Sequence, residues 1–379
     1  MKVTPGSTMR WGTAAAVAAT AVGAGAAVIL IGRRVSERTV RPQPGKPGLA
    51  ATLRVHEVAA GHVTLTRAPQ TVRAGRYALE WAGGGHAVVG GVLRTDIQTV
   101  TRRLERADSG TLTVGTEVEL TPRVHLGDPA TALGLDFTET AAQGDLGLLP
   151  AWYVHAMRGT WVILVHGPGA DRTQALPVLP VLNSLKLPTL TVTYRGDADA
   201  PHPPDGLGHF GETEWRDVEA AVGLALESGA GRVVLYGWSL GATMCLLTAA
   251  RSTRRESVAG LVLDSPILDW QESVRRESVR AGVPGVLAEL GALAAEGRTK
   301  VDPAALARLA DGTDLHLPTL LLGSPADGIA PIEAARRLAH RRWDLVSLHE
   351  VPDAEHAQLW NADSDGYAEV LRRWLTPLL

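Results

Sequence analysis

Apolar residues in the second half of the chain occur in short continuous runs, separated by longer segments with helical spacing. Continuous apolar runs of this length are typical of parallel strands that are covered on both faces. The segments between them, such as 213–227 and 332–341, place apolar residues three and four positions apart, which predicts helices. We therefore expect an α/β fold with a doubly wound, mostly parallel sheet. The predicted strands are 161–165, 189–194, 232–236, 261–264, 319–322 and 346–351.

The segment from about residue 53 to residue 126 has a different pattern, in which short runs of β-favouring residues alternate with glycine-containing turns. Gly83 to His86 is rich in glycine but lacks the lysine of a phosphate-binding loop, so we interpret it as a hairpin turn. The two patterns predict a small β-rich domain over residues 49–145, followed by an α/β domain over residues 146–379. The β-favouring runs are 63–66, 86–89 and 111–114.

A stretch without charged residues extends from Trp11 to Gly32, about the length needed to cross a bilayer. Because several arginines follow it, we expect an uncleaved, single-pass membrane anchor; a cleaved signal peptide is the alternative. The same charge bias favours a cytoplasmic location for the rest of the protein. Residues 42–48 are rich in proline and glycine and predict a linker, so anchor and linker together occupy residues 1–48.

Composition narrows the classes of function. Of the 379 residues, 45% are hydrophobic and 20% are charged, which is enough to bury a large core. The formal net charge of −3 provides no strong field for nucleic acid, so we expect no nucleic-acid partner. Cys245 is the single cysteine, which rules out an intrachain disulfide and a thiolate metal cluster. We expect neither a metal nor an organic cofactor.

A candidate nucleophile lies where a predicted strand passes into a predicted helix. The strand at 232–236 leads into Gly237-Trp238-Ser239-Leu240-Gly241, which opens an alanine- and leucine-rich segment. In this context a G-x-S-x-G motif places the serine on a tight turn, where its hydroxyl can attack a carbonyl carbon. The first amides of a helix have no partner within the helix, so the amide of Leu240 is a candidate donor to an oxyanion.

A serine hydroxyl needs a base, and the base needs an acid that orients it. His356 lies in the loop after the last predicted strand and is the best candidate base. Asp327 lies in the loop after the preceding strand, so the order Ser239, Asp327, His356 is the one expected of a hydrolase with this architecture. Asp264, at the end of its own predicted strand, is a rival for the acid.

Five motifs occur in an order that resembles the α/β-hydrolase superfamily, and the resemblance covers roughly residues 145–379. Together with the segment 212–217, they are similar to small-lid serine hydrolases of the serine aminopeptidase-like group. The resemblance implies a lid, which we place at about residues 268–315. The β-rich domain shows no such resemblance. The motifs are Val165-His166-Gly167, the Gly-Trp-Ser-Leu-Gly elbow, Leu263-Asp264-Ser265-Pro266, the Asp327 loop and the His356 loop.

One residue departs from the pattern of the superfamily. The family commonly draws an oxyanion-hole amide from the residue after its His-Gly, and here that residue is Pro168, which has no N–H. Gly169 or Ala170 would supply the second donor if the loop is shifted. Loss of one such donor typically lowers turnover about 100- to 1,000-fold.

These features imply a serine hydrolase that cleaves a carboxylic ester, or a related acyl bond, through an acyl-enzyme on Ser239, with a small-molecule acyl substrate. A peptidase of the same fold is an alternative. Because Pro168 removes a possible donor, a catalytically weak, membrane-tethered binding or scaffold protein is a further alternative from a different class.

Overall fold

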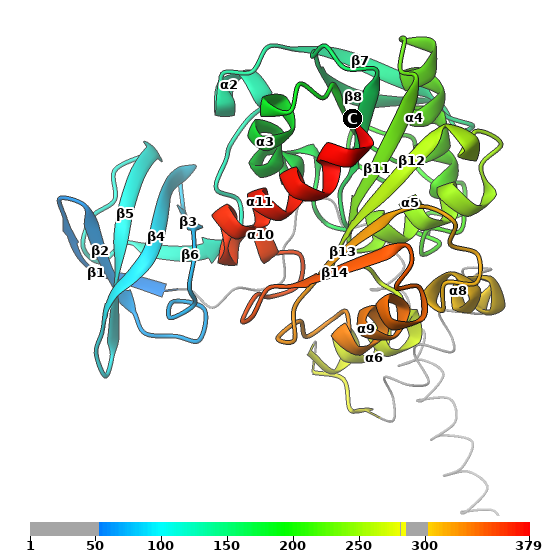
Figure 1. Ribbon diagram of the computed structural model, residues 1–379. Helices are drawn as coiled ribbons and strands as arrows, with labels where there is room; N and C mark the ends of the chain where they lie inside the picture. Colours follow the sequence, from blue (N-terminus) through cyan, green and yellow to red (C-terminus); the bar gives the residue numbers. More distant parts are fainter. Residues whose placement is uncertain (1–52, 281, 286–301) are drawn as a thin grey trace, which may run out of the picture.

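The computed structural model describes residues 53–280, 282–285 and 302–379, and it contains a β-barrel and an α/β domain (Figure 1). The predicted anchor and linker, residues 1–48, lie outside the described residues. Among the helices that are described, none is both long enough and apolar enough to cross a bilayer.

The barrel closes through six strands in the order β1-β2-β5-β4-β3-β6, and every pair is antiparallel. Apolar side chains such as Val55, Leu65 and Tyr77 meet inside it. Closure pairs both edges of the sheet, which stabilises a unit with so small a core. The strands are β1 (Leu53–Ala59), β2 (His62–Thr66), β3 (Tyr77–Trp81), β4 (Gly85–Thr95), β5 (Thr99–Ser109) and β6 (Glu117–Thr121).

Two features of the barrel test the sequence pattern directly. Gly83 and Gly84, both with positive φ, form the turn between β3 and β4, so the predicted hairpin is confirmed. The strand predicted at 111–114 is wrong, because these residues belong to the connection between β5 and β6. The pattern also fails to predict β5, whose later residues are mostly exposed and include charged side chains, so that no apolar run marks it.

The α/β domain is built on an eight-stranded sheet of order β14-β13-β12-β11-β9-β10-β8-β7. The six strands from β14 to β10 run parallel, and β8 and β7 add antiparallel pairs at one edge. The predicted doubly wound, mostly parallel sheet is therefore confirmed. The strands are β7 (Phe137–Gln143), β8 (Leu148–Val154), β9 (Thr160–Val165), β10 (Thr189–Val192), β11 (Arg232–Trp238), β12 (Val258–Asp264), β13 (Thr319–Gly323) and β14 (Val346–Glu350).

Helices cover both faces of this sheet. Ile163 and Val165 of β9 pack with α4, α5, α6, α8 and α9 on one face, whereas Val162 and Leu164 pack with α3, α10 and α11 on the other. Alternate side chains of one strand thus enter two cores, which explains the continuous apolar runs. The helices are α2 (Pro129–Leu133), α3 (Leu179–Ser184), α4 (Trp215–Glu227), α5 (Leu240–Arg251), α6 (Trp270–Arg280), α8 (Pro303–Ala310), α9 (Ile332–Arg341), α10 (Leu359–Ala362) and α11 (Ser364–Leu375).

One boundary differs from the expected one. β7 belongs to the eight-stranded sheet, although it precedes residue 146, where we expected the α/β domain to begin. Its mixture of threonine, alanine and glutamate suits an edge strand and forms no apolar run. The region expected to form a lid, residues 268–315, contains α6 and α8, and residues 286–301 within it lie outside the described residues.

Candidate active site

Ser239 occupies a tight turn between β11 and α5. Its backbone has φ 54° and ψ −120°, a conformation that is unfavourable for a residue with a side chain. Two glycines allow this turn to pack. A Cβ on Gly237 would lie 2.4 Å from the amide nitrogen of Ala242, and a Cβ on Gly241 would lie 2.3 Å from the carbonyl oxygen of Val165. The turn therefore depends on the absence of a side chain at both positions.

Three side chains predicted for the site form one hydrogen-bonded chain. Nε2 of His356 lies 2.7 Å from Oγ of Ser239, and Nδ1 of His356 lies 2.8 Å from Oδ2 of Asp327. A carboxylate only accepts, so we assign the ring proton to Nδ1, which leaves Nε2 to accept from the serine hydroxyl. Oδ1 of Asp327 accepts from the amides of Ile329 (2.7 Å) and Ala330 (2.8 Å), and these bonds hold the carboxylate toward the imidazole.

The three residues come from loops at the carboxyl ends of β11, β13 and β14, which is where reactive groups gather in open parallel sheets. All three are largely buried: Ser239 is 5% exposed, and the side chains of Asp327 and His356 are 1% and 12% exposed. Nowhere in the described residues do three His, Cys, Asp or Glu side chains converge as metal ligands do.

Asp264, the rival for the acid, makes no hydrogen bond to His356 in the described structure. Its carboxylate accepts from Oγ of Ser265 (2.8 Å) and from the hydroxyl of Tyr367 (2.6 Å) in α11. Burial raises the pKa of Asp264 to about 6, although the hydrogen bonds from Tyr367 and Ser265 lower it. The sequence did not point to Tyr367, because no local pattern relates residues 103 positions apart.

The loop that carries His356 is also held by its backbone. Asp353 and Ala357 have φ values of 58° and 54°, so both adopt the left-handed conformation that residues other than glycine rarely adopt. The amide of Ala357 donates to Oγ of Ser265 at 3.1 Å. Ser265 therefore links the buried Asp264 to the loop on one side of the imidazole.

The loop after β9 packs directly against the serine. A Cβ on Gly167 would lie 3.1 Å from the Cβ of Ser239. Pro168 and Gly169, the latter with φ 74°, form a turn that the amide of Ala170 closes on the carbonyl of Gly167 at 3.3 Å. The amide of Ala170 is thus engaged, whereas the amide of Gly169 donates to no group in the described structure.

His166, at the start of the same loop, is fully buried. Its Nε2 lies 2.9 Å from Oδ2 of Asp197, its Nδ1 lies 2.9 Å from the carbonyl oxygen of Gly167, and its ring stacks on Tyr194. Burial lowers the pKa of His166, but Asp197 and the carbonyl raise it by more, so the net pKa lies above the ordinary value. A ring with an acceptor at each nitrogen positions this loop and is not free to act as a base.

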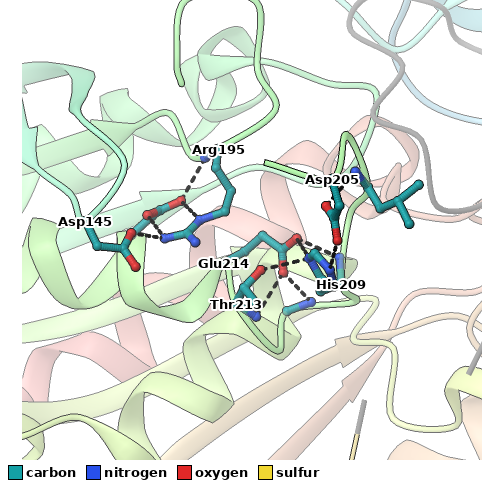
Figure 2. A network of polar contacts seen from close by, with 9 residues as sticks. Asp145, Arg195, Asp205, His209, Thr213 and Glu214 are labelled. Atoms are coloured by element: carbon teal, nitrogen blue, oxygen red, sulfur yellow. Dashed lines mark hydrogen bonds and ion pairs between the residues drawn. The ribbon is translucent and has the colours of Figure 1, made fainter. Parts of the chain in front are cut away.

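Figure 2 shows how the long connection between β10 and α4 is held. Glu214 accepts from the amides of His209 (2.7 Å), Gly211 (3.0 Å) and Thr213 (3.3 Å). The ring of His209 bridges Asp205 (3.0 Å) and the hydroxyl of Thr213 (3.1 Å). These hydrogen bonds join residues 205–214 of the connection to one another just before α4 begins.

Arg195 anchors the beginning of that connection through ion pairs with Asp217 in α4 and with Asp145 (Figure 2). Asp217 is almost completely buried, so it depends on this partner. Two acidic residues of the segment 212–217, Glu214 and Asp217, therefore hold the connection between β10 and α4 through hydrogen bonds.

Gly241→Ala is expected to lower the free energy of unfolding by about 3 kcal/mol, because the new Cβ would meet two backbone oxygens, those of Val165 and His166, that cannot rotate away. Urea unfolding measures the loss. Gly159→Ala is the matched control, since its Cβ would meet nothing within 4 Å, and it should change stability by less than about 1 kcal/mol. Equal losses in the two variants would contradict the steric account.

Asp264→Asn is expected to change the pH dependence of stability. The folded pKa, about 6, lies above the ordinary pKa of an aspartate, 3.8, so the carboxyl contributes stability at low pH that is lost as the pH rises through about 6. The stability of the wild type relative to Asp264→Asn should fall by about 3 kcal/mol between about pH 3 and about pH 7. Urea unfolding across this range measures it, and parallel pH profiles for the two proteins would refute the raised pKa.

Comparison with known proteins separates the two parts of the chain. A family model described as a domain of unknown function (DUF8805) matches residues 54–121, which form the barrel. No curated protein matches the chain. For the α/β domain, the similarities are to solved structures.

The esterase Pf2001 of Pyrococcus furiosus is similar over 67% of this chain and 95% of its own, with a TM-score of 0.55 and 16% identity. A second crystal form of that esterase covers 68% of this chain and 98% of its own, with a TM-score of 0.53 and 18% identity. DcsB in complex with its substrate analogue covers 64% and 99%, with a TM-score of 0.50 and 16% identity. Together with the strand order and the elbow, these similarities show that the chain from β7 onward has the α/β-hydrolase fold.

Proposed function

We propose that this chain is a serine hydrolase that cleaves carboxylic esters. The observation that carries the proposal is the hydrogen-bonded chain from Ser239 through His356 to Asp327 on a strained elbow. Strain of this kind costs about 1 to 3 kcal/mol and persists where the surrounding structure imposes it, often at functional sites. The similarity to an esterase of the same fold supports the reaction class.

In the proposed reaction, Oγ of Ser239 attacks the ester carbonyl while Nε2 of His356 takes the hydroxyl proton. The carboxylate of Asp327 keeps the proton on Nδ1 and stabilises the imidazolium that forms. The imidazolium then returns its proton to the departing alcohol, which leaves an acyl-enzyme on the serine. Water attacks the acyl-enzyme with His356 again as base, and the serine leaves as the hydroxyl.

The oxyanion of each tetrahedral intermediate needs donors that are preorganised before the reaction. The amide of Leu240 at the start of α5 has no partner within the helix, and the amide of Gly169 has none in the described structure. We assign the oxyanion hole to these two amides. On this assignment Gly169 compensates for the N–H that Pro168 lacks.

Ser239→Ala is expected to abolish labelling by a fluorophosphonate probe and to lower kcat on a p-nitrophenyl ester by at least about 10,000-fold, because the nucleophile is lost. Ser228→Ala, at an exposed serine at the end of α4, is the matched control and should retain both activities. Retained turnover in Ser239→Ala would refute the proposal. A wild type that never labels would favour a binding protein with this fold.

Pro168→Ala and Gly169→Ala test the oxyanion hole as a pair. Pro168→Ala adds an amide that is not needed, so kcat should stay within about twofold of the wild type. Gly169→Ala places a side chain at φ 74°, which displaces the donor, so kcat should fall about tenfold with little change in KM. Steady-state kinetics at a single temperature measures both. A several-fold rise in kcat for Pro168→Ala would show that the second donor is missing in the wild type.

A further inference from the structure

The residue before the proposed catalytic histidine, Glu355, is bound by the barrel. Nη2 of Arg73, in the connection between β2 and β3, lies 2.5 Å from Oε1 of Glu355, and Nη2 of Arg280 in α6 lies 3.6 Å from Oε2. The side chains of Arg73 and Glu355 are each only about a quarter exposed, so water screens this pair less than a surface pair. The contact joins residues 282 positions apart and lies directly beside His356.

A buried cation fixes the barrel segment that carries Arg73. Arg102 of β5 is completely buried, and its guanidinium donates to the backbone carbonyls of Thr71 (3.0 Å), Arg73 (2.7 Å) and Gly75 (2.8 Å), and to that of Gly90 (2.9 Å) in β4. Burial lowers the pKa of Arg102 to about 10. Burying a charge is unfavourable unless hydrogen bonds offset it, and three of these four bonds fix the shape of one connection.

The same connection also packs on the far side of the histidine loop, through hydrogen bonds with the backbone and the side chain of Asn361 in α10. The amide of Arg76 donates to the carbonyl of Asn361 at 2.7 Å, and Nδ2 of Asn361 donates to the carbonyls of Arg76 and Pro122, each at 2.9 Å. Gly75, at φ 96°, permits the approach, because a Cβ there would lie 1.9 Å from the carbonyl oxygen of Asn361. Figure 1 shows the barrel beside α10.

The barrel therefore holds the segment 355–361 at both ends, and His356 lies between the two contacts. This segment includes Ala357, which has a left-handed backbone and persists in that conformation only because tertiary contacts impose it. One of those contacts comes from Ser265, directly after β12. Asn361 is contacted by the barrel, and Glu355 is contacted both by Arg73 of the barrel and by Arg280 of α6.

We propose that the barrel is part of the active site, because Arg73, fixed by Arg102, is a positioning residue that sets the place of His356 through Glu355. The proposal rests on the proposed function of Ser239 and His356. It assigns a role to the barrel, which matches a family model described only as a domain of unknown function: the barrel keeps Nε2 of the histidine within reach of the serine.

Arg73→Ala in the full chain tests the proposal. A displacement of the imidazole by about 1 Å is enough to lower turnover, so kcat on a p-nitrophenyl ester should fall about 10- to 100-fold, with KM within about twofold of the wild type. The rate of inactivation by a fluorophosphonate should fall by a similar factor, because the serine attacks phosphorus and expels fluoride, a leaving group that needs no proton from the histidine. Both are measured well below the melting temperature, which is determined for each variant by circular dichroism.

Three further variants separate positioning from simple attachment of the barrel. Arg94→Ala removes the same charge from an exposed barrel ion pair with Asp96 and should leave both rates unchanged. Glu355→Gln keeps the side chain's size and should lower kcat, because it weakens the ion pairs with Arg73 and Arg280. The double variant with Arg73→Ala should be no worse than the more impaired single variant, because both substitutions act through the Arg73–Glu355 ion pair. Arg73→Lys, which retains the charge, should recover part of kcat.

The outcomes are distinct. If the wild type reacts with the probe and Arg73→Ala reacts equally fast, the positioning role is refuted while the proposed hydrolase function stands. A lower melting temperature with unchanged kcat would likewise refute the positioning role, since the contact between Arg73 and Glu355 would then only stabilise the fold. A wild type that does not react at Ser239 refutes both proposals. If Arg73→Ala does not fold, the rates of Glu355→Gln decide in the same way.

Discussion

The close approach of α5 to β9 at the elbow is the constraint on which the rest of the site depends. A Cβ on Gly241 would lie 2.3 Å from the carbonyl oxygen of Val165, so the first turn of α5 packs directly against β9. Ser239 is then left in a strained conformation at the carboxyl edge of the sheet. The strain can persist because the turn is enclosed: Gly167 packs on the serine, and the amide of Ser239 donates to the carbonyl of Asp264 at 2.8 Å.

The partners of the serine reach it by a different route, through loops held in place by buried polar groups. Asp327 is held by two amides of its own loop, whereas His356 lies on a loop that depends on other parts of the chain. Asp264 links Ser265 to Tyr367 of α11, so the carboxylate that resembles a second acid instead ties the sheet to a covering helix. A fixed geometry between loops requires such supports, because the backbone of a loop has no regular set of hydrogen bonds with a neighbouring strand.

The sequence pattern predicted the elements in which apolar and polar positions contrast clearly along the chain. The central parallel strands are buried on both faces and stand out as apolar runs, and the predicted helix at 332–341, whose buried residues lie on one face, is α9. Where one face is exposed and charged, as in β5, or where a strand lies at the edge, as in β7, the pattern carries too little contrast. The run at 111–114 failed for the opposite reason: β-favouring residues stand in a connection, because the pairing partner decides which segment becomes a strand.

The sequence by itself determined the local chemistry: a nucleophile on a strand–turn–helix elbow, with an aspartate and a histidine in the two loops that follow in order. These are short-range features, since the glycines, the serine and the flanking apolar runs lie next to one another in the sequence. Only the tertiary structure decided which aspartate faces the imidazole, because Asp264 ends β12, Asp327 lies in the loop after the adjacent β13, and their side chains have different partners. It alone joined Arg73 to Glu355, because these residues are 282 positions apart and their distance stays undetermined until both domains have folded.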